Sequence, residues 1–173
     1  ITVTEKPLAG YIQKEKKVFF DNDGLVSLIT DQLQEDLPEV TGLVTEEPVL
    51  YQKLPAQSSA HLRTLLSLTQ LLNYQGVSAR EIGFDLNMNI TVEVGKISAM
   101  LGQDEYLEEK IANLRAILNE LEGQSGTLHL EAVTGKNETA TFSAENDPEQ
   151  TEEQEGIYDP AYADAGLPAG AAE

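Results

Sequence analysis

The two histidines, His61 and His129, are the side chains of this sequence best suited to proton transfer near neutral pH. His61 follows Ser58 by three residues at the start of a predicted helix. A serine and a histidine at this spacing lack an orienting acid and an oxyanion-binding loop, so we expect Ser58 to cap the helix. His129 and Glu131 share one face of a predicted strand, but two ligands do not make a metal site. We expect them to form part of an exposed polar face.

Pairs of carboxylates occur at Glu46–Glu47, Glu108–Glu109 and Glu152–Glu153. These pairs fall on a predicted connector, on the exposed face of a helix and in an acidic tail. None of these places offers the apolar walls that raise the pKa of a carboxyl group for acid catalysis. The sequence also contains no P-loop, no dinucleotide-binding glycine motif and no nucleophile elbow. We therefore expect no enzyme activity and no catalytic residue.

A segment with Asp21, Asp23 and Gly24 resembles part of a calcium-binding loop. In that alignment Phe19 would fill the first ligand position and Thr30 the last, and neither side chain suits the position. We expect a hairpin turn instead, since glycine tolerates a positive φ at no steric cost. The sequence thus predicts neither a metal site nor a cofactor.

The composition excludes several classes of protein. The 173 residues include 30 Asp and Glu against 11 Lys and Arg, which gives a formal net charge of -19. This balance argues against binding to nucleic acid or to an anionic membrane surface. The absence of cysteine excludes disulfides, a thiol nucleophile and cysteine-bound zinc. No run of 18 apolar residues is present. Because the chain begins without Met inside a strand pattern, we expect a fragment of a longer protein.

Alternation and turn residues predict the elements of the first half of the chain. The predicted strands are Ile1–Glu5, a segment from Tyr11, the hairpin strands Lys16–Phe20 and Leu25–Ile29, and a short Val49–Tyr51. We interpret Leu37–Gly42 as a connector, because Pro38 and Gly42 punctuate it. A helix with a broad leucine face is expected from Ser58 or Ser59 to Gly76.

The second half is predicted to contain strands on both sides of one helix. The strands before that helix are Glu81–Leu86, Met88–Val94 and Ile97–Leu101. The helix, Asp104–Glu122, carries a stripe of large apolar residues, namely Leu107, Ile111, Leu114, Leu118 and Leu121. Asp104 is the expected N-cap and Gly123 the expected left-handed C-cap. Strands at Thr127–Val133 and Thr139–Phe142 follow, with Leu128 and Leu130 on the face opposite His129 and Glu131.

This order of elements predicts an α+β fold, with a mostly antiparallel sheet braced by two helices. Residues 144–173 contain no Lys or Arg and few large apolar side chains. Such a segment cannot offset the entropy lost on ordering, so we expect a disordered acidic tail. Within it, Ile157, Tyr158 and Tyr162 leave open a small docking motif, although a solvated tail is favoured.

Five segments, taken in order, resemble motifs of the bacterial cell-division family FtsQ, called DivIB in Gram-positive bacteria. They are Val3–Ala9, Val18–Gly24, Leu37–Gly42, a run from Met100 to Leu118, and Gly126–Glu131. Three departures accompany this resemblance. The proline of the first motif, Pro7, comes one residue early, His129 stands where the family usually has Asp, and Glu131 stands where Gram-negative members have Arg. The last departure favours a Gram-positive, DivIB-like member.

The resemblance implies a domain order and a role. Residues 1–8 would end a POTRA domain or its junction strand, residues 9–143 would form the family's β domain, and residues 144–173 its variable tail. The whole protein would be anchored in the cell membrane by one upstream helix, with this region outside the cytoplasm. Members of the family are non-enzymatic scaffolds of the divisome. They bind FtsB/DivIC-like and FtsL-like proteins and so connect indirectly to septal peptidoglycan synthesis.

We expect the partner to bind by adding a strand to the C-terminal edge of the sheet. The predicted partner-binding residues are Thr127, Leu128, His129, Leu130, Glu131, Val133, Thr139, Thr141 and Phe142. The sequence leaves open which of the two last strands is the free edge. A proline at Thr139 or Thr141 is expected to block strand addition without unfolding the domain, if that strand is the edge.

Two other functions remain open from the sequence. The first is a cell-wall or surface-binding module of another system, which would bind saccharides through exposed aromatic residues; the chain has no Trp and few candidates. The second, less favoured, is a carboxylate-based hydrolase, which needs two acids facing across a cleft.

Overall fold

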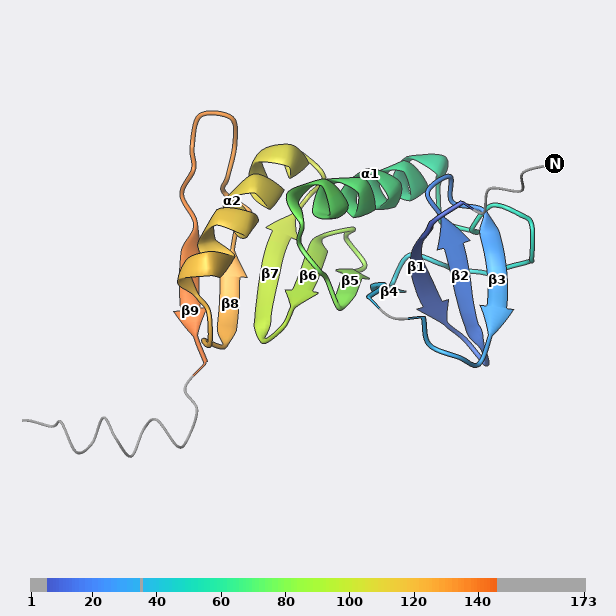
Figure 1. Cartoon of the computed structure of the whole chain (residues 1–173). Coiled ribbons are helices and arrows are strands. Elements are labelled where there is room, and N and C mark those ends of the chain that lie inside the picture. The colour runs from blue at the N-terminus through green and yellow to red at the C-terminus, as the bar shows by residue number, and fades with distance from the viewer. Residues whose placement is uncertain (1–5, 35, 146–173) are drawn as a thin grey trace, which may run out of the picture.

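The computed structural model describes residues 6–34 and 36–145, and within them nine strands form one sheet (Figure 1). The strands are β1 (Leu8–Gln13), β2 (Lys17–Asp21), β3 (Val26–Thr30), β4 (Glu39–Thr41), β5 (Glu81–Phe84), β6 (Ile90–Val94), β7 (Ile97–Gly102), β8 (Gly126–His129) and β9 (Thr141–Ala144). The helices are α1 (Ser59–Gln75) and α2 (Leu107–Glu120). The order across the sheet is β3-β2-β1-β4-β5-β6-β7-β8-β9. Most neighbouring strands run antiparallel, and only β1–β4, β4–β5 and β7–β8 are parallel, so the predicted α+β fold is confirmed.

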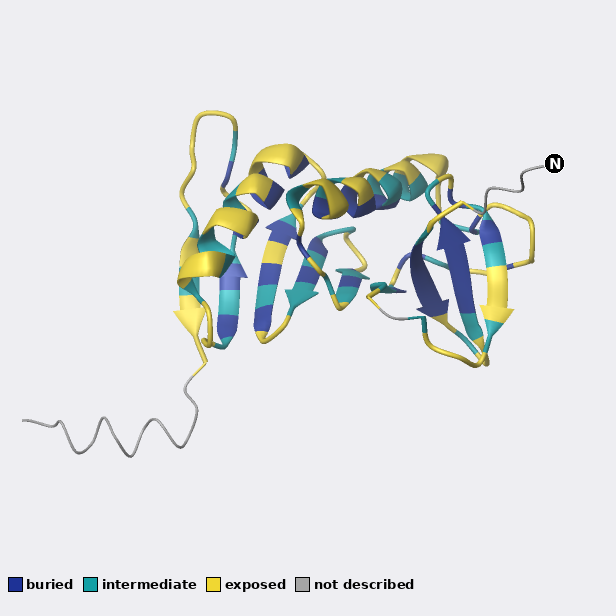
Figure 2. Ribbon diagram, viewed as in Figure 1, coloured by how far each residue is buried: buried dark blue, intermediate teal, exposed yellow. Residues whose placement is uncertain are grey.

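Both helices lie over the same face of the sheet (Figure 1). Their buried residues, which include Leu65 and Leu68 of α1 and Ile111 and Leu114 of α2, join the inward side chains of the strands in one apolar core. The expected leucine stripes therefore face the sheet. The buried side of the helices and the exposed opposite side are separated clearly in Figure 2. The other face of the sheet carries no helix among the described residues.

The β2–β3 hairpin forms at the expected Asp-Gly turn. The Asp21 side chain is 2 % exposed, and its Oδ1 accepts backbone hydrogen bonds from Asp23 (2.9 Å) and Leu25 (3.0 Å). Asp21 therefore holds the turn closed. Gly24 has φ 75°, and α1 packs so closely above it that an added Cβ would lie 3.2 Å from Leu62.

The segment interpreted as a connector, Leu37–Gly42, contains the central strand β4, so that prediction is wrong. β4 lies between β1 and β5 and runs parallel to both. Only three residues long, it is too short to show alternation. Gly42 follows it at φ 78°, where a Cβ would lie 1.8 Å from the Phe84 carbonyl oxygen. Glycine is therefore required at this position to let β4 and β5 approach.

The short strand predicted at Val49–Tyr51 is also wrong. These residues form a turn in which Gln52 N donates to the Val49 carbonyl (3.1 Å), and Tyr51 has φ 64°. Their apolar side chains suggested a strand, but all three are exposed. The turn ends beside β3, where Tyr51 N donates to the Val26 carbonyl (2.8 Å).

α1 has the predicted ends. Ser58 Oγ accepts a hydrogen bond from His61 N (3.2 Å), which confirms that this serine caps the helix. Gly76 ends α1 in the left-handed conformation, at φ 67°.

The N-cap predicted for α2 is wrong. Its N-cap is Tyr106, which has φ 56° and no side-chain capping bond. Asp104 instead accepts a hydrogen bond from Thr64 Oγ1 (2.9 Å), which ties the segment before α2 to α1. Glu108 and Glu109 in the first turn suit the positive end of the helix dipole. The predicted C-cap, Gly123, is also wrong, because the C-cap is Leu121 and Gly123 adopts its left-handed φ of 83° two residues later.

Some predictions fall outside the described residues. These are the strand at Ile1–Glu5, the pair Glu152–Glu153, and the tail from residue 146 onward. Both expected domain boundaries fall inside strands, because Leu8 begins β1 and pairs with Asp21, and Ala144 ends β9 and pairs with Gly126. Among the described residues, neither helix has the length and apolarity to cross a bilayer.

Candidate partner-binding edge

The sheet has two edges, and β9 forms the C-terminal one (Figure 1). β9 pairs antiparallel with β8, with Leu128 opposite Phe142 and His129 opposite Thr141. Its outer side has no neighbouring strand among the described residues. Of the predicted partner-binding residues, Thr141 and Phe142 therefore lie on an edge strand.

β8 is not a free edge, and this part of the prediction is wrong. It lies between β7 and β9, so the backbone groups of Thr127, Leu128 and His129 are taken up inside the sheet. The physical reason is that the chain doubles back after β8 and adds β9 outside it. The sequence left this choice open, because both segments alternate.

The remaining predicted residues lie outside the strands. Leu130 and Val133 are buried, with the Leu130 N–H donating to the Met100 carbonyl (2.9 Å). Thr139 is exposed in the β8–β9 loop, where its N–H donates to Asn137 Oδ1 (3.1 Å). Glu131 is exposed, and its Oε1 lies 3.4 Å from His129 Nδ1. The edge thus begins at Thr141 and extends to Ala144, two residues beyond the predicted end.

The hydrogen bonds of β8 show which of its backbone groups face β9. Gly126 N donates to the Lys96 carbonyl (3.2 Å) and Leu130 N to that of Met100 (2.9 Å), both on the β7 side. Backbone groups of successive residues point to opposite edges of a strand. Thr127 therefore directs its N–H and C=O toward β9, as does His129.

The same alternation fixes the free groups of β9. Thr141 and Ser143 stand opposite His129 and Thr127, so their backbone groups bond to β8. Glu145 is the next residue in this alternation, and its N–H donates to the Ser125 carbonyl (2.9 Å). Phe142 and Ala144 consequently direct their N–H and C=O groups outward, to the unpaired side. These four groups are the ones an added strand would use.

The side chains of β9 divide between the two faces of the sheet. Phe142 lies opposite buried Leu128 and packs against the core on the helix side, where it remains partly exposed. Thr141 and Ser143 are exposed on the helix-free face. Close approach of β8 and β9 requires Gly126, because a Cβ there would lie 2.3 Å from the Ser143 carbonyl oxygen.

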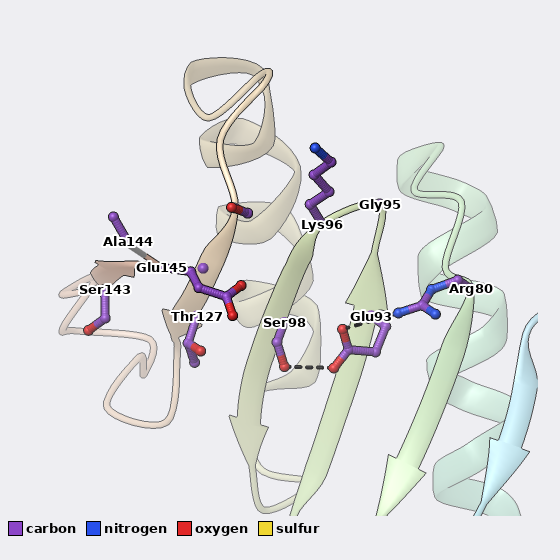
Figure 3. A pocket seen from close by; sticks show the side chains of 11 residues that line it. Arg80, Glu93, Gly95, Lys96, Ser98, Thr127, Ser143, Ala144 and Glu145 are labelled. Carbon is purple, nitrogen blue, oxygen red and sulfur yellow. Dashed lines mark hydrogen bonds and ion pairs between the residues drawn. The ribbon is translucent and has the colours of Figure 1, made fainter. Parts of the chain in front are cut away.

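A shallow hollow of about 940 Å³ lies on the helix-free face beside β9 (Figure 3). Its walls include Ser98, Thr127 and Ser143 from the neighbouring strands β7, β8 and β9. At its rim, Glu93 accepts a hydrogen bond from Ser98 Oγ (2.7 Å) and forms an ion pair with Arg80 (3.7 Å). The hollow is therefore polar, and it continues the surface that an added strand would meet.

Lys110 is a buried charged residue that the sequence reasoning missed. It is 3 % exposed, and its Nζ donates to the Gln103 carbonyl (2.9 Å). Burial lowers its pKa from the usual lysine value, although the carboxylates of Glu105 and Glu131 act in the opposite direction. The sequence indicates this burial, because Lys110 falls next to Ile111 on the apolar stripe of the helix.

The described residues contain no group of three or more His, Asp or Glu side chains placed to hold a metal ion. Neither a family model nor a curated protein matches this chain.

Proposed function

We propose that this chain is the extracytoplasmic β domain of an FtsQ/DivIB-like division protein, acting as a non-enzymatic scaffold of the divisome. The observation that carries the proposal is the position of β9, a C-terminal edge strand whose outer side has no neighbouring strand within residues 6–34 and 36–145. The proposal is also supported by the five segments that resemble motifs of the family, because they occur in the family's order along the chain.

The mechanism is strand addition to β9. An extended segment of an FtsB/DivIC-like partner bonds to the outward backbone groups of Phe142 and Ala144. These main-chain bonds supply affinity for any extended segment, so specificity depends on the side chains. On the helix side a partner residue meets the exposed part of Phe142, which favours an apolar side chain. On the other face of the sheet, the adjacent residues of the partner strand meet Thr141 and Ser143, which favours polar side chains at those partner positions.

An FtsL-like protein would bind together with that partner, and the complex would support septum formation. In this reading, a single membrane-spanning helix and a POTRA domain precede the domain in the full protein. The region described here would then stand outside the cytoplasmic membrane, attached to it through the chain upstream of β1.

Calorimetric titration with the extracytoplasmic region of a DivIC-like protein tests the proposal. We expect binding by the unchanged chain and at least about tenfold weaker binding by Ala144→Pro, which removes an outward N–H. Ala144→Ser is the matched control, because it keeps that N–H. Equal affinity of the proline variant would exclude strand addition at β9. Absence of binding by the unchanged chain and by a longer chain that includes the upstream domain would exclude the scaffold function.

A further inference from the structure

The opposite edge of the sheet, β3, and the segments beside it carry most of the large exposed apolar side chains of the described residues. Six of the ten large apolar residues that are exposed lie on or beside it. They are Leu28, Ile29, Leu33, Val49, Leu50 and Tyr51. Figure 2 shows that β3 changes from buried to exposed along its length. Exposed apolar side chains gathered at one edge of a sheet favour an interaction at that edge.

Only the first part of β3 is covered. Val26 N donates to the Gln52 carbonyl (2.9 Å) and Tyr51 N to that of Val26 (2.8 Å), so the turn at Val49–Tyr51 occupies the edge there. No comparable backbone bond reaches residues 27–30 from outside β2 within the described parts of the chain. The sequence from Val26 to Thr30 contains no charged residue and no proline, the usual protections of an edge strand.

Alternation identifies Ile29 as the residue whose backbone faces outward. Tyr11 N donates to the Pro38 carbonyl (3.0 Å), so the backbone groups of Tyr11 face β4 and not β2. Phe19, opposite Tyr11, therefore directs its groups toward β3, where it pairs with Leu28. Leu28 is thus bonded inward, and Ile29, 38 % exposed, presents its N–H and C=O to the unpaired side.

A residue whose backbone N–H and C=O face outward near the middle of an open edge can pair with the same residue of a second copy around a twofold axis. If Ile29 pairs with Ile29 of a second copy, the two residues exchange both backbone hydrogen bonds, and Leu28 lies opposite Thr30 on each side. The strands then run antiparallel. This brings Leu33, beyond the end of β3, toward the Val49–Tyr51 turn of the other copy. One symmetric contact would cover the exposed residues at both ends of the strand.

The segment that contains β3 is less acidic than the rest of the described residues, which favours self-association at this edge. Residues 6–34 contain four Lys and four Asp or Glu and are locally neutral. Residues 36–145 contain 7 Lys and Arg against 16 Asp and Glu. Two copies that meet along β3 therefore bring together strands from the locally neutral segment.

We propose that two copies of this chain associate through antiparallel pairing of their β3 strands, centred on Ile29. The contact is small, so the association is weak and concentration-dependent, and the dimer presents two β9 edges at its far ends. It rests on β3 alone and does not depend on the function proposed for β9.

Sedimentation velocity of residues 1–173 over a range of concentrations tests the proposal. We expect a reversible monomer–dimer equilibrium, and at least about tenfold weaker association for Ile29→Lys, which places a charge on the edge. Leu86→Lys is the matched control, since Leu86 is 100 % exposed in the β5–β6 turn. Dimerisation that Leu86→Lys reduces as strongly as Ile29→Lys would overturn the proposal.

Cross-linking supplies a second test, because the chain has no cysteine. The α-carbons of an antiparallel hydrogen-bonded pair are about 5.5 Å apart, within the range of a disulfide. Ile29→Cys is therefore expected to form a disulfide dimer much faster than Leu86→Cys. Equal rates would show collision alone and contradict the twofold contact. A monomer at all concentrations would overturn the proposal.

Discussion

At the residue scale, the closest packing in the sheet depends on glycine at two positions, Gly42 and Gly126. Each has a positive φ, and each would bring an added Cβ against a backbone oxygen of the neighbouring strand. Flexible side chains can move to relieve such a contact, whereas a paired backbone cannot. These residues therefore fix how closely β4 meets β5 and β8 meets β9.

Replacing Gly42 by Ala is expected to lower the free energy of unfolding by about 3–5 kcal/mol, through backbone strain and the clash with the Phe84 carbonyl. Urea denaturation measures this loss. Gly95→Ala is the control, because Gly95 also has a positive φ but has open space around it, and it should cost only about 1 kcal/mol. Similar losses at the two positions would show that strain alone, without the clash, explains the effect.

Because of Lys110, the free energy of unfolding is expected to change with pH in the alkaline range. Its folded-state pKa is lowered from 10.5, so the unfolded chain binds more protons between the folded value and 10.5. The contribution of Lys110 to the free energy of unfolding is therefore lowest at pH values below its folded-state pKa. It rises as the pH increases from that pKa to 10.5. Comparison with Lys110→Met by urea denaturation at several pH values isolates this effect. The stability of the unchanged chain relative to the variant should rise toward pH 10.5, and parallel curves would contradict the account.

At the element scale, the register of β9 predicts different effects for proline at Thr141 and at Ala144, a difference that the sequence alone does not show. Thr141 bonds to β8, whereas Ala144 directs its N–H outward. The proline expected from the sequence to spare the fold, at Thr141, is thus placed where it breaks a bond within the sheet. Thr139 lies outside the strand and offers no edge group.

Thr141→Pro is expected to lower the free energy of unfolding by about 1–3 kcal/mol, because the backbone bond to His129 is lost. Ala144→Pro removes no bond within the sheet and should cost less than about 1 kcal/mol. Thermal unfolding of the two variants against the unchanged chain measures the difference. A larger loss for Ala144→Pro would reverse the assignment of inward and outward groups.

The elements that were predicted correctly are those with a long pattern or a strong terminal signal. The leucine face of α1 with Ser58 and Gly76, and the Asp-Gly hairpin, are recognisable from local chemistry alone. β4 escaped prediction because three residues cannot display alternation, and its strand character comes from neighbours distant in sequence. The N-cap of α2 was mispredicted because Asp104 binds Thr64 of the other helix, a tertiary contact.

At the scale of the whole molecule, the net charge of -19 is expected to reduce stability at low ionic strength. Raising salt from about 0.01 M to 0.15 M shortens the screening length from about 30 Å to about 8 Å. We therefore expect the unfolding temperature to rise by a few degrees, measured by calorimetry at pH 7. Sodium chloride and potassium chloride should act alike, because the effect is screening. An unfolding temperature that falls with either salt would contradict this expectation.

The position of the edges is also a property of the whole molecule, and for this reason the sequence could not supply it. The last two strands both alternate, and only the order of strands across the sheet shows that β9 lies outside β8. The open half of β3 likewise depends on where the Val49–Tyr51 turn ends. The predicted residues therefore lie on or near the C-terminal edge of the sheet, while the choice of the edge strand among them needed the topology.

Amide hydrogen exchange of β9, with and without a DivIC-like partner, tests the central claim most directly. The amides of Thr141 and Ser143 are bonded to β8 and should already be protected in the free chain, whereas those of Phe142 and Ala144 should exchange quickly. On binding, we expect Phe142 and Ala144 to gain protection and the other two to change little. Binding that leaves Phe142 and Ala144 exchanging as in the free chain would contradict strand addition at this edge.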